Sequence, residues 1–123
     1  MERDLSKRLL KFSVRVIKFM KGQPNYVEVK IIKNQVMRSA SSAGANYIES
    51  QGGCTLKDFN YKISIALKEM RETSYWLSMF QDVRGGTIES KKLVHESIEL
   101  TKILGSIYTK TKSSQIFSIF FCV

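Results

Sequence analysis

Few residues of this sequence have the types and spacing that catalysis or metal binding requires. His95 is the single histidine, and Cys54 and Cys122 stand in no CxxC or Cys/His arrangement, so no metal site is predicted. The motifs GxxxxGK(S/T), GxGxxG and GxSxG do not occur either. The sequence therefore predicts no cofactor and no enzyme, and the two cysteines are interpreted as free thiols of a cytoplasmic protein.

A ribonuclease is the one enzyme that needs a separate test, because small basic helical bundles include nucleases of the HEPN type. These nucleases pair an arginine with a histidine a few residues later on the same helix. The nearest arginine before His95 is Arg84, and Gly85-Gly86 lies between them. Glycines commonly end helices, so Arg84 and His95 are expected on different helices. A ribonuclease is therefore the least favoured function.

The basic residues are concentrated in the N-terminal third of the chain. The net charge is +9, and residues 1–38 contain ten Lys/Arg and three Asp/Glu. Such an excess indicates a polyanion partner, RNA or DNA, while a lysine-rich face that only aids solubility is an equally valid interpretation. The candidate nucleic-acid-binding residues are Lys7, Lys11, Arg15, Lys18, Lys21, Lys30 and Lys33.

The stretch RSASSAGANYIES, residues 38–50, is rich in small side chains in its first half. A linker, a phosphate-binding loop and the inside of a packed helix are three possible interpretations. Apolar residues at helical spacing continue through the stretch from Val36 to Tyr47, which favours the helix. Serine and glycine in mid-helix each cost roughly 0.5–1 kcal/mol. The expected compensation is the close approach of another helix at this point.

Charged residues in and near this stretch predict an ion pair between two helices. If the helices on either side of Gly52-Gly53 form a hairpin, Arg38 comes level with Glu69, and a pair with Glu69 or with Glu72 is expected. An exposed pair would contribute roughly 0–1 kcal/mol, whereas a partly buried one could fix helix pairing or a subunit contact. The candidate packing and assembly residues are Arg38, Ser39, Gly44, Asn46, Glu49, Glu69, Glu72 and Trp76.

Four helices are expected to position these residues. Apolar side chains recur at steps of three and four over residues 4–21, 25–51, 55–84 and 87–112. Glycines or a proline separate the segments, and Asn25, Thr55 and Thr87 are the expected N-caps. Short connections between long helices predict an all-α fold, an antiparallel up-down-up-down four-helix bundle.

The expected bundle covers residues 1–113, and residues 114–123 form an apolar C-terminal tail that ends in IFSIFFCV. This segment is too short to span a bilayer, as is every other apolar segment, so no membrane partner is expected. An exposed tail of this composition would promote aggregation. Burial at a subunit contact is the preferred interpretation.

Two motifs together resemble a known family. They are RSASSAGANYIES and, at residues 58–77, DFNYKISIALKEMRETSYWL. Both are similar to motifs of the 23S rRNA-intervening sequence proteins and of the accessory variability proteins of diversity-generating retroelements. The resemblance covers roughly residues 4–113. The matching positions are Arg38, Ser39, Gly44, Ala45, Asn46, Glu49, Phe59, Ala66, Leu67, Glu69, Glu72, Thr73, Trp76 and Leu77.

The resemblance implies a four-helix bundle that assembles into a homopentameric ring. The intervening-sequence members have no established activity, and their name refers to the location of their genes. The retroelement relatives bind nucleic acid and a reverse transcriptase through a basic surface. The implied partners are therefore further copies of this chain, RNA or DNA, and a reverse transcriptase if the chain is retroelement-like. Its apolar C-terminus departs from the usual polar ending.

Three functions thus follow from the sequence. The favoured one is a non-enzymatic, homo-oligomeric protein whose basic surface binds RNA or DNA. The alternative is a protein–protein scaffold whose lysines serve solubility, and the ribonuclease comes last.

Overall fold

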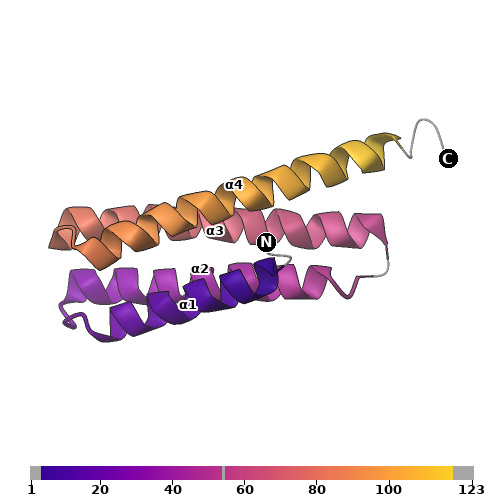
Figure 1. The fold of residues 1–123 in the computed structure, drawn as a ribbon. Coiled ribbons are helices and arrows are strands. Elements are labelled where there is room, and N and C mark those ends of the chain that lie inside the picture. The colour runs from indigo at the N-terminus through magenta and orange to yellow at the C-terminus, as the bar shows by residue number, and fades with distance from the viewer. Residues whose placement is uncertain (1–3, 54, 118–123) are drawn as a thin grey trace.

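A computed structural model describes residues 4–53 and 55–117 of the chain. Four helices make up this part: α1 (Leu5–Lys21), α2 (Val27–Ser50), α3 (Leu56–Arg84) and α4 (Ile88–Phe117). Each helix runs antiparallel to the one before it (Figure 1). The described residues contain no strand, and the expected all-α, up-down-up-down four-helix bundle is confirmed.

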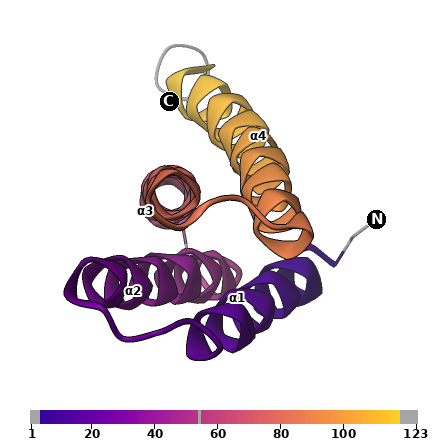
Figure 2. The ribbon, with the colours of Figure 1, turned by 90° about the vertical axis from the view of Figure 1, so that its left-hand side faces the viewer.

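The helices form a closed but uneven bundle. Consecutive helices are neighbours, and α1 also contacts α4, which closes the ring of helices seen end-on in Figure 2. α1 has 17 residues, whereas α3 has 29 and α4 has 30. Toward its C-terminal end α4 leans away from the α1–α2 pair (Figure 1). The α1–α4 contact therefore involves the first part of α4.

The core contains side chains from all four helices. Phe12, Met70, Phe80 and Leu100 are among its large, fully buried members. Phe19 meets Phe80 edge to face, with ring centroids 5.5 Å apart, a favoured geometry for an aromatic pair. Burial of this apolar surface stabilises the bundle, and it leaves the outer faces of the helices for other contacts.

The helix caps differ in one place from the sequence expectation. Thr55 caps α3 as predicted, since its Oγ1 accepts a hydrogen bond from the Asp58 amide at 3.0 Å. Thr87 likewise accepts from the Ser90 amide at 3.1 Å, next to the first turn of α4. Asn25, however, is not the N-cap of α2; that position is Tyr26. The side chain of Asn25 instead accepts a hydrogen bond from a lysine of α2, described below.

The fourth helix ends at Phe117, beyond the expected end near residue 112, so residues 114–117 lie in the helix. The rest of the tail, with its predicted subunit contact, lies outside the described residues, as do Cys54 and Cys122. In the described part, no helix combines the length and the apolar character needed to cross a membrane.

Candidate functional site

The small residues of α2 pack against α1, within the chain. Gly44 is buried, and a Cβ on it would lie 3.6 Å from Leu9 Cβ and 3.8 Å from Ser13 Oγ. Ser13 Oγ also donates a hydrogen bond of 3.0 Å to the carbonyl of Ala40. The helical interpretation of RSASSAGANYIES is confirmed, since the stretch forms the C-terminal half of α2, and the helix that approaches Gly44 is α1.

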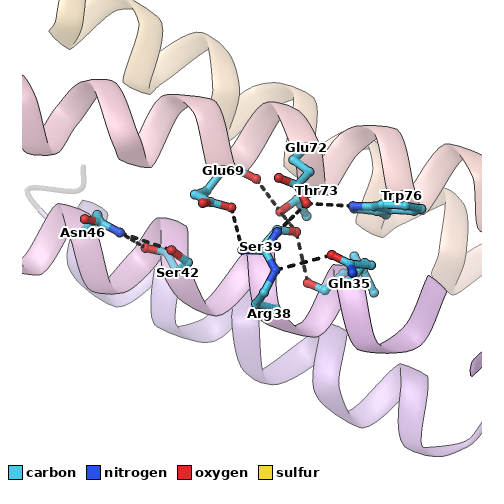
Figure 3. Close-up of polar contacts among 10 residues, drawn as sticks. Gln35, Arg38, Ser39, Ser42, Asn46, Glu69, Glu72, Thr73 and Trp76 are labelled. Atoms are coloured by element: carbon cyan, nitrogen blue, oxygen red, sulfur yellow. Dashed lines mark hydrogen bonds and ion pairs between the residues drawn. The ribbon is translucent and has the colours of Figure 1, made fainter. Parts of the chain in front are cut away.

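A buried hydroxyl pair joins α2 to α3. Ser39 Oγ and Thr73 Oγ1 lie 2.7 Å apart (Figure 3), and Thr73 Oγ1 also donates to the carbonyl of Glu69 at 2.8 Å. Both side chains are fully buried. Each buried hydroxyl is therefore hydrogen-bonded, which avoids the cost of an unpaired polar group in the core.

The predicted ion pair lies on the outer side of this hydroxyl pair. Arg38 Nη1 is 3.2 Å from Glu69 Oε1, and Nη2 donates to Glu72 Oε2. Arg38 Nε also contacts Gln35 Oε1 at 3.4 Å, and Trp76 Nε1 donates to Glu72 Oε2 at 3.0 Å (Figure 3). Arg38 therefore pairs with both glutamates that the hairpin geometry pointed to.

This network is buried at one end and open at the other. The side chain of Glu69 is 11% exposed, whereas that of Arg38 is 47% exposed. The hydrogen bond from Trp76, together with the guanidinium of Arg38, lowers the pKa of Glu72 below its usual value. The hydrogen bond to Glu72 in turn raises the pKa of Arg38. The open end leaves the guanidinium accessible to another molecule.

Two further polar residues of the stretch make different contacts. Glu49 Oε1 accepts from Lys62 Nζ at 2.7 Å, which adds another, exposed link between α2 and α3. Asn46 Nδ2 donates to the carbonyl of Ser42 at 2.9 Å and to its hydroxyl at 3.2 Å (Figure 3). Those atoms belong to α2 itself, so these hydrogen bonds do not join Asn46, a candidate packing residue, to another helix.

Most of the predicted nucleic-acid-binding residues are accessible. Arg15 is half-buried, and its guanidinium is 3.3 Å from Glu89 of α4. Five others are exposed, and none of the five forms an ion pair with a carboxylate of the described residues. They are Lys7, Lys11, Lys18, Lys21 and Lys30.

Lys33 is the exception, because its burial argues against the predicted nucleic-acid contact. Only 9% of it is exposed, because it lies four residues after Val29 and three before Val36, on the buried face of α2. Its Nζ donates to the carbonyl of Gln23 at 3.1 Å and to Asn25 Oδ1 at 2.9 Å. Lys33 therefore holds the α1–α2 loop against the helix.

A basic hollow between α1 and α4 contains residues that the sequence prediction missed. It has a volume of about 390 Å³ and is lined by Arg15, Lys91, Lys92, His95 and Glu96. Lys91 and Lys92 form no ion pair within the described ranges. The sequence could have predicted these residues, because Lys91 and Lys92 follow the Gly85-Gly86 turn and an up-down-up-down bundle places the fourth helix beside the first.

The carboxylate in this hollow is already paired. Arg8 Nε and Nη2 donate to the two oxygens of Glu96 at 2.7 and 2.9 Å, the bidentate geometry that makes Arg–carboxylate pairs strong. The charge of Glu96 is thereby compensated, and Lys91 and Lys92 remain available for an anion.

The residues considered for catalysis do not meet. Arg84 is the last residue of α3, and its guanidinium lies over the ring of Tyr26, 5.7 Å from the centroid. His95 is an exposed residue of α4. Nowhere among residues 4–53 and 55–117 do three or more His, Cys, Asp or Glu side chains gather in a group suited to a metal ion.

Comparison with known proteins agrees with the four-helix fold. No curated protein matches the chain. A crystal structure of a protein of unknown function from the S23 ribosomal protein family of Bacteroides thetaiotaomicron is similar, with a TM-score of 0.76 and 33% identity. The match covers 84% of this chain and 96% of that one. Residues 2–106 match the family described as 23S rRNA-intervening sequence protein, and the chain belongs to that family.

Proposed function

We propose that this chain is a non-enzymatic, homo-oligomeric protein whose α1–α4 face binds the phosphate backbone of RNA or DNA. The observation that carries the proposal is the set of exposed, unpaired lysines on α1, continued by Lys91 and Lys92 on α4 beside Arg15. Two helices thus present cations to one surface, here called the basic face. Its residues are Lys7, Lys11, Arg15, Lys18, Lys91 and Lys92.

The spacing of the α1 lysines supports a phosphate backbone as the ligand. At 1.5 Å per residue, Lys7 and Lys11 are about 6 Å apart along the helix axis, and Lys11 and Lys18 about 10 Å apart. A duplex strand carries one phosphate per about 3.4 Å of axis. Each lysine can therefore meet a different phosphate, two or three nucleotides from the next.

Assembly into a ring would multiply these contacts. The pentamer implied by the family resemblance would place copies of the basic face around one belt, and several phosphate contacts would act together. The α2–α3 face is the proposed subunit contact, because the guanidinium of Arg38 is half-exposed and Tyr75 is exposed beside Trp76. We place such a ring in the cytoplasm, and a reverse transcriptase is a further protein partner if the retroelement relationship holds.

A salt-dependent RNA-binding assay tests the proposal. Fluorescence anisotropy with a labelled structured RNA should give an affinity that falls steeply with salt. Replacement of Lys7, Lys11 and Lys18 by glutamine should make the negative slope of log K against log salt shallower, by about 0.7–0.9 for each phosphate that is no longer neutralised. The matched control replaces three exposed lysines outside the face, Lys57, Lys68 and Lys110, and should change the slope little.

Light scattering with the 260/280 nm absorbance ratio reports subunit number and co-purifying nucleic acid together. No RNA or DNA binding at low salt, or equal effects of the two triple variants, would refute the basic face. A ring without nucleic-acid affinity would favour the scaffold function instead.

A further inference from the structure

The side of α1 next to α2 borders an apolar groove whose apolar side chains take no part in the proposed nucleic-acid binding. The groove lies between α1 and α2 and has a volume of about 440 Å³. Leu10, Val14 and Ile17 line it from α1, and Ala45 and Ile48 from α2. Leu10 is 65% exposed and Ile48 is 53% exposed. These side chains face solvent although each could bury apolar surface against a partner.

The shape of the groove fits a helix. Leu10, Val14 and Ile17 follow one another at steps of four and three, so they form one line along α1. The α2 side contains Ser41, Gly44 and Ala45, whose small side chains allow the backbone of another helix to come close. A trough between two helices suits apolar residues at i, i+3 or i+4, and i+7 of a third helix. A flat lipid surface would contact the ridges rather than the trough.

The charge around the groove selects the chemistry of that helix. Lys7 lines the groove, and Lys18 and Lys21 are exposed and follow Val14 and Ile17 by four residues along α1. None of these lysines is paired with a carboxylate in the described part of the chain. A contact between the same faces of two copies would bring these lysines together, in a chain whose net charge is already +9, whereas carboxylates of a different protein would neutralise them.

We propose that the α1–α2 groove binds an amphipathic helix of a partner protein, with apolar residues on one face and acidic residues along its edges. The apolar face of the partner covers the exposed side chains of the groove. Its carboxylates pair with the lysines of α1. The groove and the α1–α4 hollow are separate cavities, although Lys7 and Lys18 belong to both proposed surfaces. Variants of the apolar groove that change no lysine therefore test the partner helix apart from nucleic-acid binding.

A synthetic peptide serves as the probe. It is a fluorescein-labelled helical sequence of about 18 residues with leucines at i, i+3 and i+7 and glutamates along both edges. The comparison peptide has lysines in place of the glutamates. The acidic peptide should bind in fluorescence anisotropy, and the basic one should bind at least tenfold more weakly.

Two tryptophan variants locate the binding. Ala45→Trp fills the groove from an exposed position of α2, and Ser78→Trp adds the same side chain at an exposed position of α3. Ala45→Trp should weaken peptide binding at least tenfold, and Ser78→Trp should not change it. Circular dichroism melting shows whether each variant is folded, and RNA affinity should be the same in both.

Other occupants would overturn the proposal. If Ala45→Trp lowers the oligomeric mass in light scattering and Ser78→Trp does not, the groove receives a second copy of this chain. If Ala45→Trp instead abolishes flotation with phosphatidylserine vesicles but leaves peptide binding intact, the surface binds lipid. Absence of peptide binding to the wild-type protein, or equal peptide binding by the two variants, also rejects a partner helix.

Discussion

Lys33→Met should destabilise the bundle without affecting nucleic-acid binding. The amino group of Lys33 donates to the Gln23 carbonyl and to Asn25 Oδ1, and methionine keeps most of the buried stem but removes both hydrogen bonds. A hydrogen bond to a charged group contributes about 1.5–3 kcal/mol. Asn25 is exposed and Gln23 half-buried, so both acceptors can bind water in the variant. We therefore expect a net destabilisation of about 1–2 kcal/mol.

Thermal unfolding followed by circular dichroism measures this destabilisation. For a domain of this size, about 1–2 kcal/mol corresponds to a fall in Tm of about 4–8 °C. Lys30→Met is the matched control, because Lys30 is an exposed lysine of the same helix, and surface substitutions usually change stability by less than about 0.5 kcal/mol. Well below Tm, Lys33→Met should bind RNA as the wild type does. Wild-type Tm combined with weaker RNA binding would show that Lys33 is a contact residue and not a loop anchor.

Three further predictions concern α2 and its neighbours. Arg38→Ala leaves Glu69 without its cationic partner and should cost about 1–3 kcal/mol in urea unfolding; it should also lower the oligomeric mass, and no change in either quantity would contradict the role of Arg38. The folded-state pKa of Glu72 is lowered. The ionised carboxylate therefore contributes to the free energy of unfolding above its unfolded pKa of about 4.3, and this contribution is lost as pH falls through the folded pKa. The difference in stability between wild type and Glu72→Gln should shrink below about pH 4, and a constant difference would exclude this linkage. Gly44→Ala should stabilise the protein by about 0.5–1 kcal/mol, because the added Cβ would lie at an ordinary contact distance of 3.6 Å from Leu9 Cβ; a lower Tm would show that the α1–α2 contact has no room for a methyl group.

The sequence predicted the helices and one long-range contact because both depend on simple geometry. Steps of three and four between apolar residues mark a buried helix face, and glycines mark the ends of α2 and α3. Once these helices are folded back on each other, the positions opposite Arg38 can be counted along α3. This reasoning led to Glu69 or Glu72 as the partner of Arg38, and the structure contains both contacts.

Lys33 and Asn46 show where such reasoning fails. Residue type suggested an exposed lysine, but position on the helix decides burial, and Lys33 lies between Val29 and Val36 on the inner face. Asn46 could bond to a neighbouring helix or to the preceding turn, and no spacing rule decides between the two. It bonds to the carbonyl of Ser42, one of the local contacts that asparagine often makes.

The organisation of α1 explains why one short helix borders two surfaces of different chemistry. Its inner face, with Leu9 and Phe12, is buried in the core. Because α2 and α4 flank it on either side, one edge pairs Arg8 with Glu96 of α4, and the other presents Leu10 to the groove beside α2. The exposed lysines lie between these edges. A polyanion on one side and an acidic helix on the other would therefore contact the same row of lysines.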